Sequence, residues 1–380
     1  MSSLPTIPIR TLAPPAQLAE ALTTWRGFVE LAPPAPRLQG RAYAELGKKA
    51  NGWIWRRLPT ASASALGCYF LHDLDICGSG YPFHRGRFVH EGVHTSDAAL
   101  EWLADPNFHD HPITRPPRNT ITVDRPVLMV FGPGSSIYGH WLLDFLPRVA
   151  IAQRLLGPDL RDFVLPLPSD TPVWARTMME TFCDIRADRI LPYDRRDDRL
   201  VCARACLPSF AHNGSYVLHP FMRTFYDQFG KRFTGGTKRR ICLSRRNQER
   251  ETFSYRRIFE KRERLEQLAE DRGFAVVRPE ELSFPDQVAL LRSAGCVLGE
   301  TGSGLHASVF CDPGTIVAAV GWFSEPQYRI AAAFEQQLIV MSRCPTIEDP
   351  NVDFHFTAAD ADLERLLAMV AQLENGRRLP

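Results

Sequence analysis

The chain has 380 residues, which is long for a single hydrophobic core and predicts two domains of ordinary size. Its composition, 44% hydrophobic and 23% charged, is that of a soluble globular protein. The formal net charge is only +2, from 45 basic and 43 acidic residues, and this balance argues against a nucleic-acid-binding protein.

Two features of the sequence bear on the cellular compartment. The 9 cysteines are scattered without a Cys-x-x-Cys pair, which is typical of reduced thiols in protein cores rather than of a disulfide framework or a zinc site. No apolar run is long enough to predict a membrane span, and the proline-rich N-terminus lacks the apolar core of a signal peptide. We therefore expect a cytoplasmic protein.

The first 40 residues form a Pro- and Ala-rich segment with one short predicted helix, within residues 16–31. Residues 67–93 alternate apolar and polar side chains around Gly turns, a pattern typical of a turn-rich β-sheet. The histidines of this region have no tight ligand spacing, so the sheet is favoured over a metal site. These histidines are His72, His84, His90 and His94.

The next elements alternate between strands and helices. An apolar strand within 125–134 leads into a helix over 135–156, and strands at 162–168 and 189–194 flank a helix over 172–183. Strands that alternate with helices predict a parallel sheet with right-handed crossovers.

The pattern restarts after a Gly-rich break at 233–240. Gly273 is placed to end a helix, and Ser283 followed by Pro285 is placed to begin one. Helices separate five predicted strands, and this alternation predicts a doubly wound α/β domain. The strands lie within 240–244, 275–279, 296–300, 315–320 and 338–343.

We therefore expect an α/β protein with two Rossmann-like domains, whose parallel sheets face a cleft. The first domain is predicted over residues 1–230, with the Pro-rich segment and the β-rich stretch at its start, and the second over 231–345. An amphipathic helix within 346–380 is expected to pack back onto the first half. Ligands of open α/β sheets bind at the carboxyl ends of the strands, so the site is expected at such edges.

A glycine-rich turn is the clearest chemical signal. The strand that ends at Gly299 is followed by Gly302, Ser303 and Gly304, which begin the next helix. Glycines let backbone N–H groups approach an anion, and a helix N-terminus adds positive partial charge. The spacing is neither that of a dinucleotide-binding fingerprint nor that of a P-loop, and a tight turn without a ligand is an equal alternative.

Arg245 and Arg246 directly follow the apolar strand within 240–244. They are therefore expected at the same sheet edge as the glycine turn, where guanidinium groups can clamp a diphosphate. The alternative is a solvated basic loop.

His140, Asp144 and Arg148 interrupt an otherwise apolar helix at intervals of four residues. This spacing puts them on one face, and a mostly buried helix exposes such a stripe more readily to a cleft than to bulk water. An imidazole near a helix N-terminus is favoured in its neutral form and can act as a base. The alternative is a surface ion pair with His140 as a cap.

Four stretches together resemble glycosyltransferase family 61, which includes bacterial capsular-polysaccharide transferases and eukaryotic O-linked N-acetylglucosamine and xylose transferases. They are "YGHWLLDFLPR", "RICLSRR", "GFAVVRPEELSFPDQVALLRSA" and "GETGSGLHASVFCDPGTIV". The resemblance implies a GT-B architecture and an inverting transfer from a UDP-sugar to a hydroxyl of a glycan or lipid-linked acceptor. It also implies that no metal and no further cofactor are required.

The resemblance further implies that the base comes from the His140/Asp144 pair. His140 is favoured as proton acceptor with Asp144 orienting it; the alternative is Asp144 as base with His140 on the donor phosphate. Arg148 then binds donor phosphate or holds Asp144. The donor side is completed by Arg245, Arg246, Gly302, Ser303, Gly304 and His306.

Two departures from the family pattern concern the donor sugar. Arg250, Arg256 and Arg257 stand where many relatives have an Asn-Glu pair, and Glu300 brings a carboxylate close to the expected phosphate site. The resemblance also implies that the acceptor is a bacterial surface glycan assembled in the cytoplasm. Peripheral contact of the protein with the inner face of the membrane is an open alternative. A catalytically silent nucleotide- or sugar-binding module is the alternative function.

Overall fold

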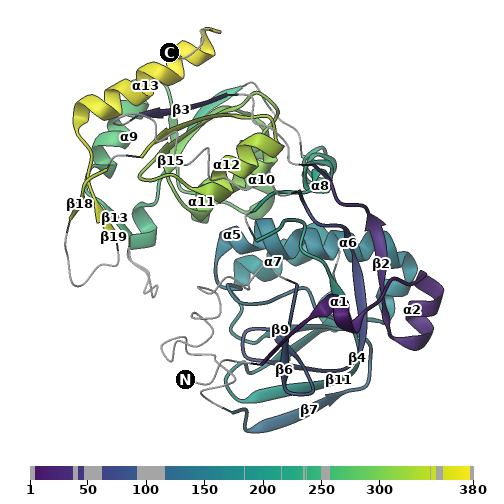
Figure 1. The fold of residues 1–380 in the computed structure, drawn as a ribbon. Helices are drawn as coiled ribbons and strands as arrows, with labels where there is room; N and C mark the ends of the chain where they lie inside the picture. Colours follow the sequence, from purple (N-terminus) through teal and green to yellow (C-terminus); the bar gives the residue numbers. More distant parts are fainter. Residues whose placement is uncertain are drawn as a thin grey trace. The chain divides into compact units, whose positions relative to one another are not determined.

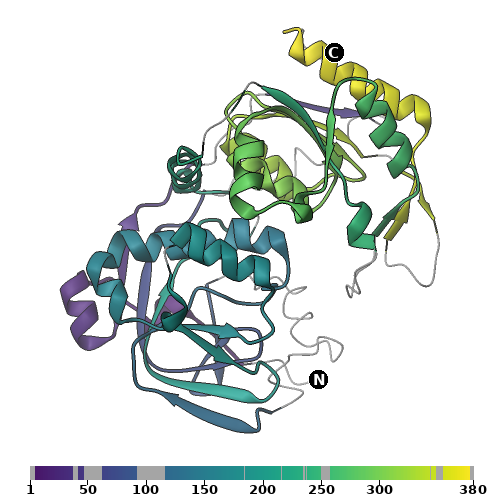
Figure 2. The same cartoon turned by 180° about the vertical axis from the view of Figure 1, so that it is seen from behind.

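The computed structural model describes residues 5–36, 42–46, 62–91, 116–183, 185–214, 216–233, 236, 238–249, 257–342, 344–347 and 354–376 (Figures 1 and 2). The chain forms two compact units. The first comprises Met1–Arg37 and Ala61–Met222, and the second comprises Leu38–Thr60 and Arg223–Pro380. The boundary thus falls inside helix α8 (Pro220–Gly230), and not after residue 230 as the sequence led us to expect.

A mixed sheet of eight strands forms the centre of the first unit. Its order is β1-β6-β5-β4-β11-β7, with β2 paired to β4 and β8 paired to β11. The long strands β4 and β11 run antiparallel and pair along almost their whole length. The strands are β1 (Thr6–Pro8), β2 (Gly27–Ala32), β4 (Leu66–Cys77), β5 (Tyr81–His84), β6 (Arg87–His90), β7 (Asn119–Val123), β8 (Val127–Leu128) and β11 (Asp198–Pro208).

This sheet differs from the Rossmann-like parallel sheet that we expected for the first domain. The turn-rich stretch after residue 66 forms β4, β5 and β6 as predicted, but β11, which the sequence did not single out, pairs antiparallel with β4. The predicted strands β9 (Leu165–Pro168) and β10 (Ile190–Tyr193) are parallel to each other and form a separate two-stranded sheet. Antiparallel partners replace the expected crossovers because β4 and β11 bury apolar side chains against each other.

Helices cover this sheet, and one of them carries the candidate site. The helix α6 contacts β2, β4 and β11, so it lies directly on the central strands. The helical segments of the unit are α1 (Ile9–Leu12), α2 (Leu18–Thr24), α5 (Tyr138–His140), η1 (Trp141–Phe145), α6 (Leu146–Leu156), η2 (Gly157–Asp162), α7 (Val173–Cys183) and η3 (Ala187–Arg189).

The second unit has the predicted doubly wound organisation. Its main sheet has the order β14-β12-β15-β16-β17-β3, and all its neighbouring strands are parallel. The five strands expected from the sequence are all present. The six strands are β3 (Ala42–Leu46), β12 (Arg239–Leu243), β14 (Ala275–Val277), β15 (Ala294–Glu300), β16 (Ile316–Val320) and β17 (Gln337–Met341).

Helices lie on both faces of this sheet (Figures 1 and 2). On one face α9 (Arg262–Glu270) contacts α13 (Asp360–Glu374), while α10 (Phe284–Arg292), α11 (Ser303–His306) and α12 (Glu325–Ala333) pack together on the other. Ser283 accepts a hydrogen bond from the Asp286 N–H group at the start of α10, which confirms the predicted cap. The remaining elements are η4 (Arg246–Glu249), η5 (Pro279–Glu281), η6 (Ala307–Phe310) and a small sheet of β13 (Arg257–Phe259), β18 (Thr346–Ile347) and β19 (Phe354–Phe356).

Two segments belong to the second unit although we had expected them elsewhere. The strand β3, from the N-terminal part of the chain, pairs with the edge strand β17. The terminal helix α13 packs on β16 and β17 of this unit, where its apolar face joins the core, instead of packing back onto the first half. An amphipathic helix buries its apolar stripe on a sheet face, and the sheet of the second unit supplies that face.

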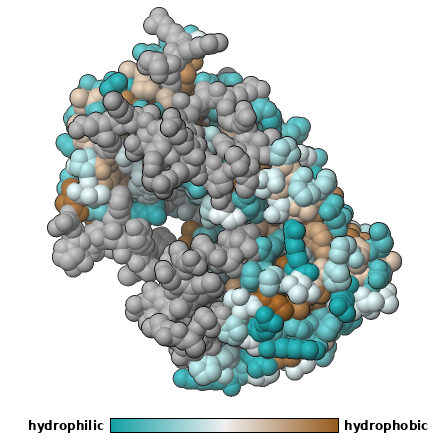
Figure 3. All heavy atoms as spheres, viewed as in Figure 1, coloured by the Kyte–Doolittle hydropathy of each residue, from teal (hydrophilic) through white to brown (hydrophobic). Residues whose placement is uncertain are grey.

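The described part of the surface that faces the viewer in Figure 3 carries many hydrophilic side chains. On the first-unit face shown in Figure 3, hydrophobic side chains form small areas between hydrophilic ones. Among the described residues, the large hydrophobic side chains that are exposed are Ile137, Val173 and Trp174. No helix in the described ranges is long and apolar enough to cross a bilayer. Eight of the cysteines are described as free thiols, and all but Cys344 are buried.

Candidate active site

The helix that carries His140 and Asp144 contains a turn of π-helix. The α-helical residues Tyr138–His140 continue into the π-helical residues Trp141–Phe145, and α6 begins at Leu146. Pro147 has no N–H group, and its ring clashes with the carbonyl of the residue four positions earlier, so the α-helical hydrogen bond is lost here. Such π turns are rare and often mark functional sites. Asp144 lies within this turn.

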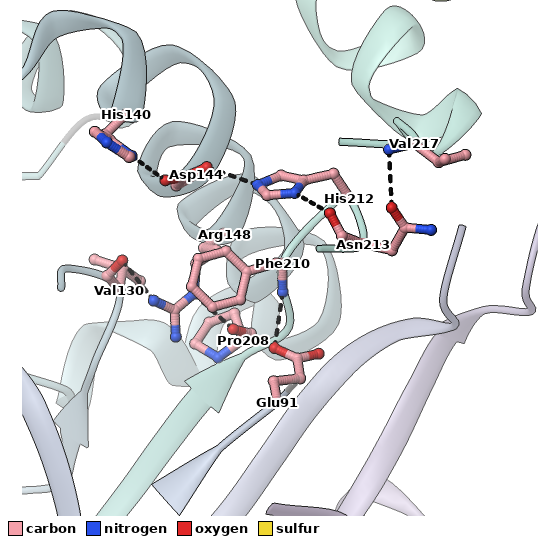
Figure 4. A network of polar contacts seen from close by, with 10 residues as sticks. All are labelled: Glu91, Val130, His140, Asp144, Arg148, Pro208, Phe210, His212, Asn213 and Val217. Atoms are coloured by element: carbon pink, nitrogen blue, oxygen red, sulfur yellow. Dashed lines mark hydrogen bonds and ion pairs between the residues drawn. The ribbon is translucent and has the colours of Figure 1, made fainter. Parts of the chain in front are cut away.

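Asp144 joins two histidines through its two carboxylate oxygens (Figure 4). Its Oδ2 lies 2.5 Å from Nδ1 of His140, and its Oδ1 lies 2.6 Å from Nε2 of His212. Nδ1 of His212 lies 2.8 Å from the backbone oxygen of Asn213. The helix therefore contributes the two predicted residues, and the loop after β11 contributes a third that the sequence did not single out.

The three side chains differ in their exposure to solvent. The side chain of His140 is 23% exposed, whereas those of Asp144 and His212 are 1% exposed. Burial alone would raise the pKa of Asp144, but the charge of His140 and the hydrogen bonds from both histidines hold that pKa well below its ordinary value. Asp144 is therefore an ionised carboxylate that is almost completely shielded from solvent.

His140 has the geometry of an oriented base. Its Nδ1 faces Asp144, so the ring is fixed and Nε2 remains as the other proton site. Burial lowers the pKa of His140, but the charge of Asp144 and the hydrogen bond to it outweigh burial and raise the pKa above 6.5. The helix N-terminus, which we expected to favour the neutral ring, is therefore outweighed by Asp144.

A loop with a glycine at position 134 leaves room for the ring of His140. Gly134 has a φ of +86°, and a Cβ atom built there would lie 2.6 Å from Cδ2 of His140. The loop is tied to the helix by the indole of Trp141, whose Nε1 donates to the backbone oxygen of Ser135 at 2.7 Å. Gly134 is thus required both by its backbone conformation and by the close approach of the imidazole.

A cavity of about 110 Å³ lies beside His140 within the first unit. Most of its lining is apolar, but two histidines, a glutamate and an arginine also reach it: His90, His140, Glu91 and Arg148. Small-molecule sites are typically apolar concavities with a few polar groups that fix the orientation of the ligand. The apolar part includes Tyr81, Phe88, Met129, Phe131, Leu207 and Phe210.

Arg148 is held by the main chain of its own unit. Its Nε donates to the oxygen of Pro208 at 2.7 Å, and its two terminal nitrogens donate to Val130 at 2.9 Å and to Met129 at 3.0 Å. Its guanidinium carbon also lies 4.6 Å from the centroid of the Phe210 ring. Arg148 is therefore a cation that ties helix α6 to two strand ends, and these three hydrogen bonds go to main-chain oxygens and not to Asp144.

Glu91 is a second charged group in this wall, and its charge acts on that of Arg148. Its Oε1 accepts from the hydroxyl of Tyr69 at 3.2 Å, and its Oε2 accepts from the N–H group of Phe210 at 3.0 Å. Burial raises the pKa of Glu91 to about 7, although Arg148 and these hydrogen bonds oppose the rise. A carboxyl group with this pKa can both accept and donate hydrogen bonds at neutral pH.

In the second unit, the expected donor residues lie at a topological switch point. The strands β14 and β15 lie on opposite sides of β12. Within this sheet the chain goes from β12 to β14 but from β15 to β16, so the connections from the neighbours β12 and β15 run in opposite directions. Leu243 at the end of β12 pairs with Gly299 near the end of β15, so the next residues of both strands leave the sheet side by side. Ligands of doubly wound sheets bind at such a point.

Gly302 and two arginines meet at this point. A Cβ atom built on Gly302 would lie 2.6 Å from a terminal nitrogen of Arg245 and 3.1 Å from one of Arg257. The guanidinium carbon of Arg257 also lies 4.9 Å from the centroid of the Trp322 ring. The structure thus brings Arg245 to the glycine turn, as expected, and adds Arg257.

The other residues expected on the donor side have separate surroundings. The terminal nitrogen of Arg246 lies 2.6 Å from Glu266, which ties it to helix α9. Glu300 makes a buried two-point pair with Arg262, at 2.5 and 3.1 Å, so its charge is balanced within the unit. Ser303 and His306 begin and end the short helix α11, and the space around the α-carbon of Gly304 is open.

Strand β4 carries two carboxylates, those of Asp73 and Asp75. Asp73 pairs with His72, and Asp75 lies 3.2 Å from Arg199. In the part of the chain that the structure describes, no group of three or more His, Cys, Asp or Glu side chains is arranged to hold a metal ion. His94, Arg250 and Arg256, named above, lie outside the described residues.

One family model matches the central part of the chain. Residues 138–318 match the family model Glycosyltransferase 61. The match begins at helix α5 and ends within β16, so it covers His140, Asp144, the glycine turn and the arginines that follow β12. It supports a glycosyltransferase, and hence a sugar donor and an acceptor as substrates. A search among curated proteins gave no match to the chain.

Sequence reasoning missed His212 and Glu91. His212 stands 68 positions after Asp144, in an ordinary His-Asn-Gly turn, and nothing local marks it as a partner of that carboxylate. Glu91 lies near the end of the β-rich stretch, where polar and apolar residues alternate, so nothing in the sequence distinguishes it from the other polar residues. His212 could have been predicted only from the pairing of β11 with β4. Helix α6 lies on these two strands, so the loop after β11 comes close to that helix.

Proposed function

We propose that the protein is an inverting glycosyltransferase that moves a sugar from a nucleotide-diphosphate donor, UDP-linked in our proposal, to a hydroxyl group. The observation that carries the proposal is the partly exposed imidazole of His140, which is oriented by a buried carboxylate and borders an apolar cavity. Within a glycosyltransferase, this arrangement suits a base for the acceptor hydroxyl.

The acceptor step uses His140 as base and Asp144 as its orienting partner. Nε2 of His140 takes the proton of the hydroxyl group while the hydroxyl oxygen forms a bond to the anomeric carbon. The bond from that carbon to the diphosphate oxygen breaks, and the diphosphate leaves with the bonding electrons. A single displacement of this kind inverts the anomeric carbon. Asp144 is less suited as base because it is buried and both its oxygens are engaged.

The donor step places the diphosphate at the glycine turn of the second unit. Arg245 and Arg257 supply positive charge there, and the lack of a side chain at Gly302 allows both guanidinium groups to come close. Two guanidinium groups offset the charge that develops on the leaving diphosphate, so the proposed mechanism needs no metal ion or other cofactor. We propose that the two units together act as a GT-B enzyme, one for each substrate.

The acceptor is proposed to be a bacterial surface glycan, such as a capsular polysaccharide, or its lipid-linked precursor. Synthesis would then take place in the cytoplasm, at the inner face of the membrane. The apolar lining of the cavity beside His140 supports an acceptor that presents an apolar surface next to its reactive hydroxyl group.

The test is a calorimetric titration of the whole protein with UDP, GDP, ADP, dTDP and CMP in the presence of EDTA, followed by transfer assays with the matching nucleotide sugars. We expect selective binding of UDP and release of UDP on transfer. Binding of another nucleoside diphosphate would keep the reaction and change the donor. Nucleotide binding without transfer to any glycan acceptor would identify a silent binding module, and folded protein that binds no nucleotide would contradict the proposal.

A further inference from the structure

One carboxylate in this protein serves two imidazoles of different accessibility. Asp144 lies between the partly exposed ring of His140 and the buried ring of His212 (Figure 4). The proposed reaction uses His140 and Asp144, and it gives His212 no task. A buried histidine that is bonded to the orienting carboxylate affects the proton affinity of the outer ring through that carboxylate.

The hydrogen-bond partners of His212 define its protonation. Its Nδ1 faces the backbone oxygen of Asn213 at 2.8 Å, and its Nε2 faces Oδ1 of Asp144 at 2.6 Å. A carbonyl oxygen can only accept a hydrogen bond, and so can an ionised carboxylate. Hydrogen on both ring nitrogens of His212 satisfies both acceptors, and a ring that carries both hydrogens is a cation.

The surroundings of His212 fit a fixed cation. Its ring is stacked on that of Tyr216, with centroids 4.7 Å apart and an interplanar angle of 16°, and an aromatic face attracts positive charge. Asn213 stabilises the loop through two hydrogen bonds. Its Oδ1 accepts from the N–H group of Val217 at 3.0 Å, and its backbone oxygen accepts from the N–H group of Tyr216 at 2.9 Å. The ring of His212 is therefore held in place by bonds that do not involve Asp144.

We propose that His212 is a positioning residue that carries a positive charge, balances the charge of Asp144, and thereby keeps His140 available as a proton acceptor. The inference rests on the proposed function in treating His140 as the base. Without a second cation, the full charge of Asp144 would act on His140 and hold its proton more tightly. A base that remains protonated at the working pH cannot accept the proton of the acceptor hydroxyl.

Other charged groups near His140 do not replace His212. Arg148, Glu91 and His90 line the same cavity. Arg148 and Glu91 have opposite charges and interact with each other. These groups remain unchanged when His212 is substituted, so the comparison below isolates the effect of His212.

The first experiment needs no variant. Nitrogen-15 NMR of the histidine-labelled wild-type protein distinguishes an imidazolium, with both ring nitrogens protonated, from either neutral tautomer. We expect the resonances of His212 to be those of an imidazolium at pH 7, while those of His140 titrate. A neutral His212 at pH 7 would overturn the proposal.

The second experiment is the variant His212→Gln, which retains a side-chain donor without the charge. The titration of His140 is expected to move up by about one pH unit, and the acid limb of the pH profile of kcat/KM is expected to move with it. His219→Gln is the matched control. His219 lies on the same loop, but its ring bonds to Phe221 and Pro33 and not to Asp144. An unmoved His140 titration in folded His212→Gln would overturn the proposal.

The two readouts separate this inference from the proposed function. A moved His140 titration in a protein that transfers no sugar would retain the role of His212 and contradict the transferase. Normal transfer with an unmoved titration would retain the transferase and contradict the role of His212.

Discussion

Asp144 is buried and shares its two oxygens between His140 and His212. Ionised carboxylates are stable in a protein interior only when hydrogen-bond donors replace the lost water, and two imidazoles do so here. The two oxygens of Asp144 have different partners. Oδ2 orients the partly exposed ring of His140, and Oδ1 bonds to the buried ring of His212. A change at Asp144 therefore affects both histidines at once.

The first prediction concerns this pair. His140→Ala and Asp144→Asn should each lower kcat by about 10²- to 10⁴-fold, because the acceptor hydroxyl loses its base or the base loses its orientation. The affinity for UDP should remain close to that of the wild type, because neither residue belongs to the unit that holds Gly302. Single-turnover transfer and calorimetry measure the two quantities separately. An equal loss of UDP binding would assign the pair to the donor side instead.

The second prediction compares two neighbouring arginines. Arg245→Ala should weaken UDP binding by roughly 10- to 100-fold, which corresponds to a charge-assisted hydrogen bond of about 1.5–3 kcal/mol. Arg246→Ala is the matched control, because that side chain pairs with Glu266, and it should change the affinity much less. Calorimetric titration decides between them. Equal losses in both variants would contradict the clamp of Arg245 and Arg257 at the glycine turn.

The third prediction concerns Glu91 and the stability of the fold. The pKa of this carboxyl group rises from 4.5 to about 7 on folding, so between these values the unfolded chain has lost a proton that the folded chain retains. The contribution of Glu91 to the free energy of unfolding therefore falls as the pH rises through this window. Glu91→Gln should remove that fall. Urea unfolding at pH 5 and pH 8 tests this, and an identical pH dependence in both proteins would contradict it.

The helix that carries the site depends on a local irregularity. A regular α-helix would place residues 140, 144 and 148 on one face, as the sequence suggested, but the π turn at Trp141–Phe145 separates the roles of these residues. His140 and Asp144 meet each other, whereas Arg148 bonds to the carbonyl oxygens of Val130 and Pro208. Pro147 provides the physical reason because it cannot supply the missing α-helical donor.

The fourth prediction tests the loop that supports this helix. Gly134→Ala adds a side chain 2.6 Å from the His140 ring at a φ of +86°, so it should displace the imidazole and reduce kcat strongly. Gly86→Ala is the control, since it has a φ of +74° and no atom within 4 Å of the added carbon. It should show only the cost of a left-handed conformation, about 1–2 kcal/mol. Thermal unfolding and transfer rates separate the two effects, and similar kcat values in both variants would contradict this role of Gly134.

The chain returns to the second unit from two directions. The strand β3 lies in the chain between β2 and β4 of the first sheet, yet it is an edge strand of the parallel sheet in the second unit, and helix α13 from the end of the chain packs on that same sheet. An edge strand without a partner exposes a row of backbone hydrogen-bonding groups, which β3 covers on β17. The second unit is therefore complete only with residues from the N-terminal part of the chain.

The fifth prediction follows from this topology. Leu46 at the end of β3 is buried in the core of the second unit, and Leu46→Ala should destabilise that unit by about 2–5 kcal/mol. Amide exchange should then be faster in β16 and β17 than in β4 and β11. Leu12→Ala, earlier in the same N-terminal segment but packed against the core of the first unit, should give the reverse pattern. Faster exchange in the first unit of Leu46→Ala would contradict the assignment of β3.

Local patterns were sufficient to predict much of the second unit and part of the site. Its five strands, the Ser283 cap and the glycine turn follow from hydrophobic periodicity and turn chemistry, which depend on neighbours along the chain. His140 and Asp144 were found for the same reason, because they lie one helical turn apart.

Contacts between distant segments decided the rest. The antiparallel pairing of β4 with β11, the addition of β3 to the second unit, and the bond from His212 to Asp144 join residues far apart in the sequence. Arg148 and Arg246 look like ligand residues in the sequence, yet a guanidinium group bonds to whichever acceptors the fold brings near it. The sequence by itself determined which segments form strands and helices and where the chemical groups stand along the chain. Only the tertiary structure decided which of those groups meet, because side-chain partners are set by packing and not by spacing.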